Sequence, residues 1–308
     1  MGSSLLDDFN VRAHLNAYWL RPESALWDCI AARHLGIALK GRSDIVEVGI
    51  GNGFFSFLLF GGQFAPEFDW FYSVDTRGFW SHTDIFDHDS EISLGRFVTK
   101  APDIRLRLGL DHKQTLLNQA ARLGFVDELV QHDCNQPLPA GRTYQTAYSN
   151  MLYWLMDPIG AMHNIAQILE SGGQLITVFP NSDFYRSCAS YVRKDPLWIL
   201  LNRGRANHIM WHMDISEFER GIQDGGVFEL TSATRYLAPL TLKTWDIGLR
   251  PLSVPLIKMA NALTPEKRQE IKTEWCDTIE QFVEPMLMNE LELDATTGGF
   301  NLVVLTKK

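Results

Sequence analysis

Backbone amides and carboxylates at the ends of apolar runs are the groups in this sequence that could hold a ligand. The run Asp44-Ile-Val-Glu-Val has the composition of a short buried strand, and it leads through Gly49, Gly51 and Gly53 into an apolar segment that starts at Phe54. A strand that enters a tight glycine turn and leaves it as a helix lets backbone N–H groups and the helix N-terminus approach a ligand closely. The segment therefore predicts a strand, a ligand-binding turn and a helix.

The spacing of these glycines differs from the dinucleotide-binding fingerprint. It is G-x-G-x-G, whereas the fingerprint requires G-x-G-x-x-G. Position 54 is Phe, which would hinder the close helix-to-strand packing that the third glycine of the fingerprint provides. This departure counts against a nicotinamide dehydrogenase.

Two later apolar runs end in carboxylates. Asp111 ends the run Leu108-Gly-Leu and is followed by His112 and a helical pattern, while Asp133 and Cys134 follow Leu129-Val-Gln-His. A carboxylate at the end of the second strand of a wound sheet can accept both hydroxyls of a ribose. At the end of the next strand, the Asp133 side chain and the Cys134 backbone N–H could bind the edge of an adenine.

A second segment competes with Asp111 for the ribose. Trp70-Phe-Tyr-Ser-Val-Asp75 is also an apolar run that ends in Asp, and it lies nearer to the glycine turn. We favour Asp111 because a helical segment follows it directly and because its distance from Asp133 suits one helix and one strand. Thr-Arg-Gly-Phe-Trp, which follows Asp75, does not have a helical pattern.

In this order the motifs resemble those of the class I S-adenosylmethionine-dependent methyltransferases, over roughly residues 44 to 180. The E-x-G-x-G-x-G turn of that family is similar to Glu47 through Gly53, and its L-x-P-G-G turn is similar to Leu169-Glu-Ser-Gly-Gly, with Ser in place of Pro. The resemblance implies S-adenosyl-L-methionine as cofactor. It implies cofactor contacts from Glu47, Gly49, Gly51, Asn52, Gly53, Asp111, His112, Asp133, Cys134 and Asn150.

Candidates for the chemical step follow the predicted fourth and fifth strands. Tyr153 and Trp154 could place aromatic faces beside a sulfonium, although they could equally cover the adenosine or fill core. If the acceptor is a hydroxyl, His208 or His212 could act as general base. Their i, i+4 spacing would put both on one helical face, but no third metal ligand is evident, so we expect no metal. Ordinary structural histidines remain the alternative.

Aromatic and charged segments outside the core pattern could enclose a substrate. Tyr18, Trp19 and Arg21 near the N-terminus resemble helices that cap the cofactor in small-molecule members of the family, although Arg21 could simply form a surface ion pair with Glu23. The acidic segment 82–89 could hold a cation or be a solvated loop, and we interpret the insertion around it as a lid.

The remaining pattern predicts an α/β fold: a Rossmann-like wound sheet of about seven mostly parallel strands with an antiparallel last strand. Helical stretches at 112–123, 158–169 and 216–223 separate strands expected at 104–110, 128–132, 146–148, 174–179, 227–235 and 300–306. We expect a single domain over 1–308: a helical cap at 1–43, a core sheet at 44–239 and 294–308 with an insertion at 61–103, and a helical insertion at 240–293.

Composition limits the partners. The formal net charge is −9, which disfavours binding to nucleic acid or to an anionic membrane surface. The four cysteines are far apart, and no apolar run is long enough to span a bilayer. We therefore expect a cytoplasmic protein without membrane insertion. The helical insertion could pack on its own sheet or on a second subunit, so a homodimer stays open.

The leading interpretation is methyl transfer from S-adenosylmethionine to a small molecule, with O-methylation of a metabolite or sugar-like substrate expected. Two alternatives retain the cofactor site: a different reaction, such as aminopropyl transfer or a rearrangement, or a non-catalytic nucleoside-binding scaffold.

Overall fold

A seven-stranded sheet forms the centre of the molecule. The computed structural model describes residues 8–72, 74, 93–138, 141–188, 211–294 and 296–308. In the sheet the strands run in the order β5-β4-β1-β6-β7-β9-β8. Their bounds are Ile45–Val48 (β1), Leu106–Asp111 (β4), Val126–Gln131 (β5), Tyr144–Ser149 (β6), Leu169–Pro180 (β7), Phe228–Tyr236 (β8) and Phe300–Lys307 (β9).

The predicted fold class is confirmed. β1 pairs in parallel with β4 on one side and with β6 on the other, so the winding reverses its direction at β1. β9 runs antiparallel to both of its neighbours, β7 and β8, as expected of a last strand. Parallel strands joined by helices are buried on both faces, which agrees with the fully buried residues of β1.

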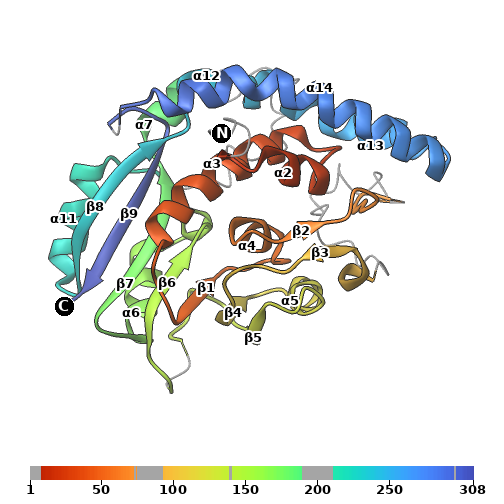
Figure 1. Ribbon diagram of the computed structural model, residues 1–308. Coiled ribbons are helices and arrows are strands. Elements are labelled where there is room, and N and C mark those ends of the chain that lie inside the picture. Colours follow the sequence, from red (N-terminus) through yellow and green to blue (C-terminus); the bar gives the residue numbers. More distant parts are fainter. Residues whose placement is uncertain (1–7, 73, 75–92, 139–140, 189–210, 295) are drawn as a thin grey trace.

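Helices cover both faces of the sheet (Figure 1). One face carries α3, α4 and α5 and the other carries α6 and α11, because crossovers that move in opposite directions along a wound sheet place their helices on opposite faces. The helices span Pro22–Leu39 (α3), Phe54–Leu59 (α4), Gln114–Ala121 (α5), Pro158–Ala166 (α6) and Ile215–Gly225 (α11).

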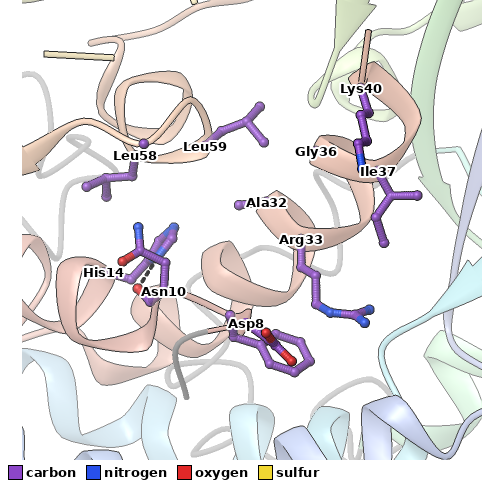
Figure 2. A pocket seen from close by; sticks show the side chains of 12 residues that line it. Asp8, Asn10, His14, Ala32, Arg33, Gly36, Ile37, Lys40, Leu58 and Leu59 are labelled. Carbon is purple, nitrogen blue, oxygen red and sulfur yellow. Dashed lines mark hydrogen bonds between the residues drawn. The ribbon is translucent and has the colours of Figure 1, made fainter. Parts of the chain in front are cut away.

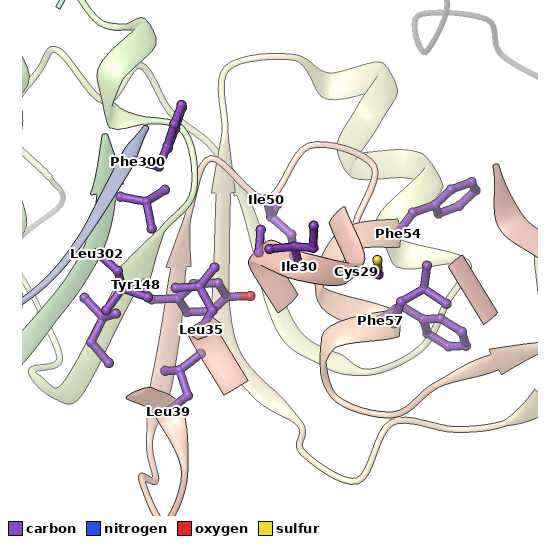
Figure 3. Close-up of a cluster of buried hydrophobic side chains, with 14 of the residues drawn as sticks. Cys29, Ile30, Leu35, Leu39, Ile50, Phe54, Phe57, Tyr148, Phe300 and Leu302 are labelled. Atoms are coloured by element: carbon purple, nitrogen blue, oxygen red, sulfur yellow. The ribbon is translucent and has the colours of Figure 1, made fainter. Parts of the chain in front are cut away.

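The core lies mainly between α3 and the sheet. Figure 3 shows Cys29, Ile30 and Leu35 of α3 packed near Tyr148 of β6 and Ile50 of the glycine turn. Ile30 and Leu35 are fully buried. A helix that is apolar on most of its surface belongs in the interior, and α3 has further helices packed on its outer side.

The smaller elements lie around this sheet. A two-stranded hairpin forms from segments on either side of residues that lie outside the described part of the chain. These elements are α2 (Val11–Ala17), β2 (Gln63–Phe64), η3 (Leu94–Phe97), β3 (Val98–Lys100), η4 (Leu152–Trp154), α7 (Ser182–Ser187), α12 (Pro239–Lys243), η5 (Thr244–Leu249), η6 (Arg250–Leu252), α13 (Ser253–Ala260) and α14 (Pro265–Leu291).

One boundary prediction is wrong. The segment Leu169-Glu-Ser-Gly-Gly, expected to be a helix end and a turn before the fifth strand, is part of β7. Tyr144 pairs with Leu169 and Thr146 already pairs with Gln174, so the extra residues form a bulge in the ladder. The glycines therefore introduce a kink within the strand and do not precede it.

The long helix α14 lies across α2 and α3 as an outer layer (Figure 1). It is attached by a buried ion pair: the Arg268 guanidinium donates to the Asp69 carboxylate, and both side chains are less than a tenth exposed. Trp19 donates its Nε1 proton to the same carboxylate at 2.9 Å. These contacts link α14, the cap and the segment after β2 into one packed unit, which we call the latch (Trp19, Asp69 and Arg268).

Candidate functional site

Loops from four adjacent strands meet at the carboxyl edge of the sheet. β5, β4, β1 and β6 are neighbours, so Asp133, Asp111, the glycine turn and Asn150 follow strands that lie side by side. In wound sheets, ligands bind outside the carboxyl ends of the strands where the winding direction reverses. The glycine turn follows β1, at which the direction reverses.

Asp111 is fixed directly to the glycine turn. Its Oδ2 accepts a hydrogen bond from Gly51 N–H at 2.9 Å, and its Oδ1 accepts one from Lys113 N–H at 2.9 Å. The residue is 5% exposed. Each carboxylate oxygen has two acceptor positions. His112 Nδ1 lies 3.4 Å from Oδ1, so Oδ2 is the oxygen with a position left for a ligand. The turn and the carboxylate thus form one preorganised unit.

The rival segment has a different structure. Trp70, Phe71 and Tyr72 form turns, and the described part of this segment contains no strand. Asp75 lies outside the described residues. Asp111, by contrast, is the last residue of β4, which pairs with β1.

The glycines of the turn have different surroundings. At Gly49 the backbone φ is +82°, and an added Cβ would lie 2.8 Å from the Met151 sulfur. At Gly51 φ is +58°, and an added Cβ would meet no heavy atom within 4 Å. Gly49 is therefore enclosed by the protein, whereas Gly51 borders open space that a ligand could fill.

Glu47 lies beneath the turn in a buried hydrogen-bond chain. Ser56 donates to the Glu47 carboxylate at 2.5 Å, and Tyr148 donates to the Ser56 oxygen at 2.6 Å. Burial raises the pKa of Glu47 to about 8, so the carboxyl group is mostly protonated at neutral pH. In this position it fixes α4 to β1 and β6 through its own hydrogen bonds, and its contact with a cofactor remains a prediction.

The other predicted cofactor residues surround this unit. Asp133 is exposed and accepts hydrogen bonds from Asn135, which lower its pKa. Cys134 is buried, and burial raises the pKa of its thiol to about 12. His112 is exposed beside Asp111. The Asn52 side-chain oxygen accepts a hydrogen bond from Phe54 N–H at the start of α4, and its buried Nδ2 has no hydrogen-bond partner among the described residues.

Tyr153 and Trp154 lie in η4, directly after β6. The Tyr153 side chain is buried, with its ring edge-on to Phe300 at a centroid distance of 5.4 Å and tilted against Trp154 at 5.3 Å. The aromatic pair thus stands at the carboxyl edge and also fills core, as both sequence interpretations allowed.

Of the two histidines proposed as general bases, the structure describes only His212. His208 lies outside the described residues. His212 is exposed, is not in a helix, and has its ring 4.5 Å from that of Tyr185. The predicted helix that would carry both histidines does not include His212. The role of general base remains a prediction for either residue.

The cap residues predicted to meet a substrate are buried. Trp19 belongs to the latch, with the Arg268 guanidinium 5.2 Å from its ring centroid. Arg21 does pair with Glu23, at 2.9 Å, but the pair is buried and not at the surface. Tyr18 is buried beside Asp28, and burial raises its pKa well above the ordinary value.

Several residues of the site were not singled out from the sequence. Ser56 and Tyr148 complete the chain to Glu47, and Met151 covers Gly49. Ser56 carried a signal, since it is the polar residue in the apolar run from Phe54 to Phe60. Met151 carried none, because a methionine after a strand is typical of core.

Metal-ligand clusters and membrane-spanning helices are absent from the described part of the chain. No group of three or more His, Cys, Asp or Glu side chains there could hold a metal ion, and the acidic segment 82–89 lies outside it. None of the described helices combines the length and the apolar character needed to cross a membrane. All four cysteines are buried free thiols.

Comparisons with known proteins give only distant likenesses. No protein-family model and no curated protein sequence matches the chain. Among similar solved structures is an S-adenosylmethionine-dependent methyltransferase from Mesorhizobium loti, at 15% sequence identity and a TM-score of 0.45, with 90% of this chain and 97% of that chain covered. Another is an S-adenosylmethionine-dependent methyltransferase from Geobacter sulfurreducens in complex with S-adenosyl-L-homocysteine, at 15% identity and a TM-score of 0.45, with 90% of each chain covered. A third is the [4+2]-cyclase SpnF, at 11% sequence identity and a TM-score of 0.43, with 92% of this chain and 82% of that chain covered. At these scores a likeness indicates no function by itself, and the fold is assigned from the strand order.

Proposed function

We propose that the protein binds S-adenosyl-L-methionine at the carboxyl edge of the sheet and transfers its methyl group to a small-molecule acceptor. The observation that carries the proposal is the bond between Asp111 and Gly51 N–H, at the place where the sheet reverses its winding. It joins a turn of the kind that admits a ligand to a carboxylate of the kind that binds a ribose.

The described residues fit a nucleoside cofactor. Gly51 borders open space, and Asp111 has an acceptor position left on Oδ2. The buried Asn52 Nδ2 offers an unused donor beside the turn. Asp133 follows β5, the neighbour of β4, which supports a role for it on the adenine side.

When bound, S-adenosylmethionine supplies a methyl group on an activated sulfonium. The residues of the chain then have mainly to position the cofactor and the acceptor and to shield them from water. Asp111 and the turn would hold the nucleoside, while Tyr153 and Trp154 would exclude water and place aromatic faces near positive charge. If the acceptor is a hydroxyl, His212 or His208 would receive its proton.

We further propose O-methylation of a metabolite or sugar-like acceptor in the cytoplasm. The aromatic rings of Tyr153 and Trp154, directly after β6 at the carboxyl edge of the sheet, support a site for a small-molecule acceptor there. A homodimer through the helical insertion is supported by the exposed side chains of Met259, Phe282 and Met288, and light scattering would measure the mass of the assembly.

Calorimetry tests the cofactor site. We expect S-adenosylhomocysteine to bind wild type and to bind Asp111→Asn about 10- to 100-fold more weakly, because a charged hydrogen-bond acceptor contributes about 1.5–3 kcal/mol. Asp103→Asn, which removes an exposed carboxylate paired with Lys100, is the matched control and should bind as wild type. No binding to folded wild type would overturn the proposal.

Product analysis tests the reaction. Incubation with S-adenosylmethionine and a panel of hydroxylated metabolites should release S-adenosylhomocysteine together with a methylated product. Release of methylthioadenosine would indicate transfer of the 3-amino-3-carboxypropyl group, and its release from decarboxylated S-adenosylmethionine would indicate aminopropyl transfer. An isomerised acceptor with intact cofactor would indicate a rearrangement. Tight binding without turnover of any acceptor would favour a nucleoside-binding scaffold.

A further inference from the structure

The helix α3 has two halves that face different parts of the molecule. Its second half, with Gly36 and Ile37, faces Leu58 and Leu59 of α4 across a hollow (Figure 2). This half ends shortly before β1, which starts at the amino edge of the sheet. The first half of α3, which carries Trp27, therefore lies towards the carboxyl edge, where the cofactor site is proposed.

Trp27 contacts the sheet at that edge. Its ring is edge-on to the ring of Phe300, with the two centroids 4.9 Å apart. Phe300 starts β9 and pairs with Pro180, the last residue of β7. Trp27 thus lies over the ends of β7 and β9.

This part of the edge adjoins the part that would hold the cofactor. Asp111 and Asp133 follow β4 and β5, whereas β7 and β9 lie on the other side of β1 and β6. Tyr153, which follows β6, is also edge-on to Phe300, at 5.4 Å. A nucleoside bound over β1, β4 and β5 would leave the ends of β6, β7 and β9 for an acceptor.

Trp27 and Trp154 are the partly exposed members of a connected group of aromatic rings. Trp27 also contacts Phe184 at 6.2 Å and Trp245 at 4.9 Å, and Tyr153 contacts Trp154 at 5.3 Å. The other members are 6% exposed or less. We call the group the aromatic wall: Trp27, Tyr153, Trp154, Phe184, Trp245 and Phe300. Aromatic surface that buried neighbours hold in place and leave partly exposed is typical of small-molecule sites.

Trp245 reaches the aromatic wall from an uncommon type of helix. η5 is a π-helix of 6 residues, and π-helical turns are rare and occur frequently at functional sites. Arg250 lies over the Trp245 ring at 4.6 Å and pairs with the buried Asp246 at 2.8 Å. The guanidinium is therefore engaged within its own segment, and the wall offers a ligand aromatic surface.

These side chains suit a flat aromatic ligand better than a sugar. Aromatic rings attract one another edge-on or offset, at centroid distances of about 4.5–7 Å. Each sugar hydroxyl that leaves water needs a polar partner, whereas the members of the aromatic wall offer at most one polar side-chain atom each. A phenol has a pKa of about 10 and gives up its proton more readily than a sugar hydroxyl, so an exposed histidine such as His212 would be a sufficient base.

We propose that the acceptor is a planar aromatic molecule with a phenolic hydroxyl, and that its ring packs against Trp27. The inference rests on the function proposed above and narrows the acceptor to aromatic metabolites. Trp27 is then a residue that determines specificity, because it contacts the ring of the acceptor.

Two probes with one skeleton test the preference for an aromatic ring. 2-Naphthol and decahydro-2-naphthol both carry a hydroxyl on two fused six-membered rings, and only the first is aromatic. In calorimetry with S-adenosylhomocysteine at saturation, we expect 2-naphthol to bind about tenfold more tightly, because aromatic pairs attract beyond the area that they bury. myo-Inositol, which represents sugar-like acceptors, should not compete with it.

Variants test the role of Trp27. Trp27→Leu should reduce the preference for 2-naphthol to about twofold, and Trp27→Phe, which keeps a ring, should restore part of it. Both variants should bind S-adenosylhomocysteine as wild type does. Trp275→Leu is the matched control, because Trp275 is also partly exposed but lies on α14, where its Nε1 donates to the Trp19 carbonyl oxygen at 2.8 Å. It should keep the wild-type preference, and thermal unfolding would show that each variant is folded.

The outcomes separate this inference from the proposed function. If S-adenosylhomocysteine binds but 2-naphthol does not, or if Trp27→Leu keeps the full preference, the aromatic acceptor site is refuted and the cofactor site stands. Binding of decahydro-2-naphthol or myo-inositol as tight as that of 2-naphthol would refute it as well. The same titrations without S-adenosylhomocysteine cover the converse case: binding of 2-naphthol that depends on Trp27, in a protein that does not bind S-adenosylhomocysteine, would support the aromatic site and overturn the proposed function.

Discussion

The substitutions Gly49→Ala and Gly51→Ala should impair the protein for different reasons, although the two glycines belong to one turn: the first mainly lowers stability, and the second mainly lowers affinity for the ligand. Gly49 is covered by Met151, whose sulfur would lie 2.8 Å from a new Cβ, and Gly51 borders open space. Both have positive φ, so both substitutions cost backbone strain of about 1–2 kcal/mol. Only Gly49→Ala adds an overpacking cost, of about 1–3 kcal/mol.

The expected pattern separates stability from binding. Gly49→Ala should lower the free energy of unfolding by about 2–5 kcal/mol, and Gly51→Ala by about 1–2 kcal/mol, measured by urea denaturation. Gly51→Ala should nevertheless weaken S-adenosylhomocysteine about 10- to 100-fold, because its methyl group occupies the space of the ligand. Combining Gly49→Ala with Met151→Ala should recover the overpacking part of the cost but not the backbone part.

Gly124→Ala is the matched control. Gly124 has φ of +71° and nothing within 4 Å of an added Cβ, yet it lies in the turn after α5. Gly124→Ala should lower the free energy of unfolding by as much as Gly51→Ala does, and it should bind S-adenosylhomocysteine as tightly as wild type. Wild-type affinity in Gly51→Ala would refute the idea that a ligand approaches this backbone. Equal destabilisation by Gly49→Ala and Gly51→Ala would refute the role of Met151.

Three further outcomes follow from buried groups. Arg268→Met should lower the free energy of unfolding by about 3–5 kcal/mol, because it leaves the Asp69 carboxylate buried without its cation. Lys267→Met, which breaks an exposed ion pair, should lower it by less than about 1 kcal/mol. Chemical denaturation measures both, and equal losses would contradict the stabilising role of the latch. The pKa of Glu47 is raised from 4.5 to about 8, so the free energy of unfolding of wild type should fall as pH rises between these values, where the unfolded chain loses a proton that the folded chain keeps. Glu47→Gln should remove this dependence of stability on pH. The same pH profile in both proteins would show that the Glu47 carboxyl group is not protonated in the fold. The four cysteines should react slowly with a thiol reagent in the folded protein and rapidly in urea, and fast labelling of the native state would contradict their burial.

The sheet and the loops that meet at its carboxyl edge could be predicted from the sequence because they depend on local pattern. Apolar runs that end in glycine or Asp, with helical segments between them, placed β1, β4 and Asp111 correctly. Parallel strands bring such ends together whatever the loops do, so the edge follows from the alternation itself.

The contacts of the cap could not be predicted in this way. Trp19 has the residue type of a substrate contact, but Asp69 and Arg268, its partners in the latch, stand far from it in sequence. Glu47 has the position of a cofactor ligand in the family motif, but Ser56 and Tyr148 engage it from two other elements. Nothing in local pattern specifies a partner that only the tertiary fold brings near.

The latch also affects the order in which the chain can fold. Arg268 and Asp69 are separated by 199 positions, and the bond from Trp275 Nε1 to the Trp19 carbonyl oxygen spans 256. Contacts between such distant segments form late, because the entropy of closing the loop must be overcome before they stabilise anything. During synthesis the cap would therefore emerge before α14, the helix that covers it. Until α14 has left the ribosome, the aromatic side chains of the cap would lack their cover, and chaperones would meet the nascent chain at that surface.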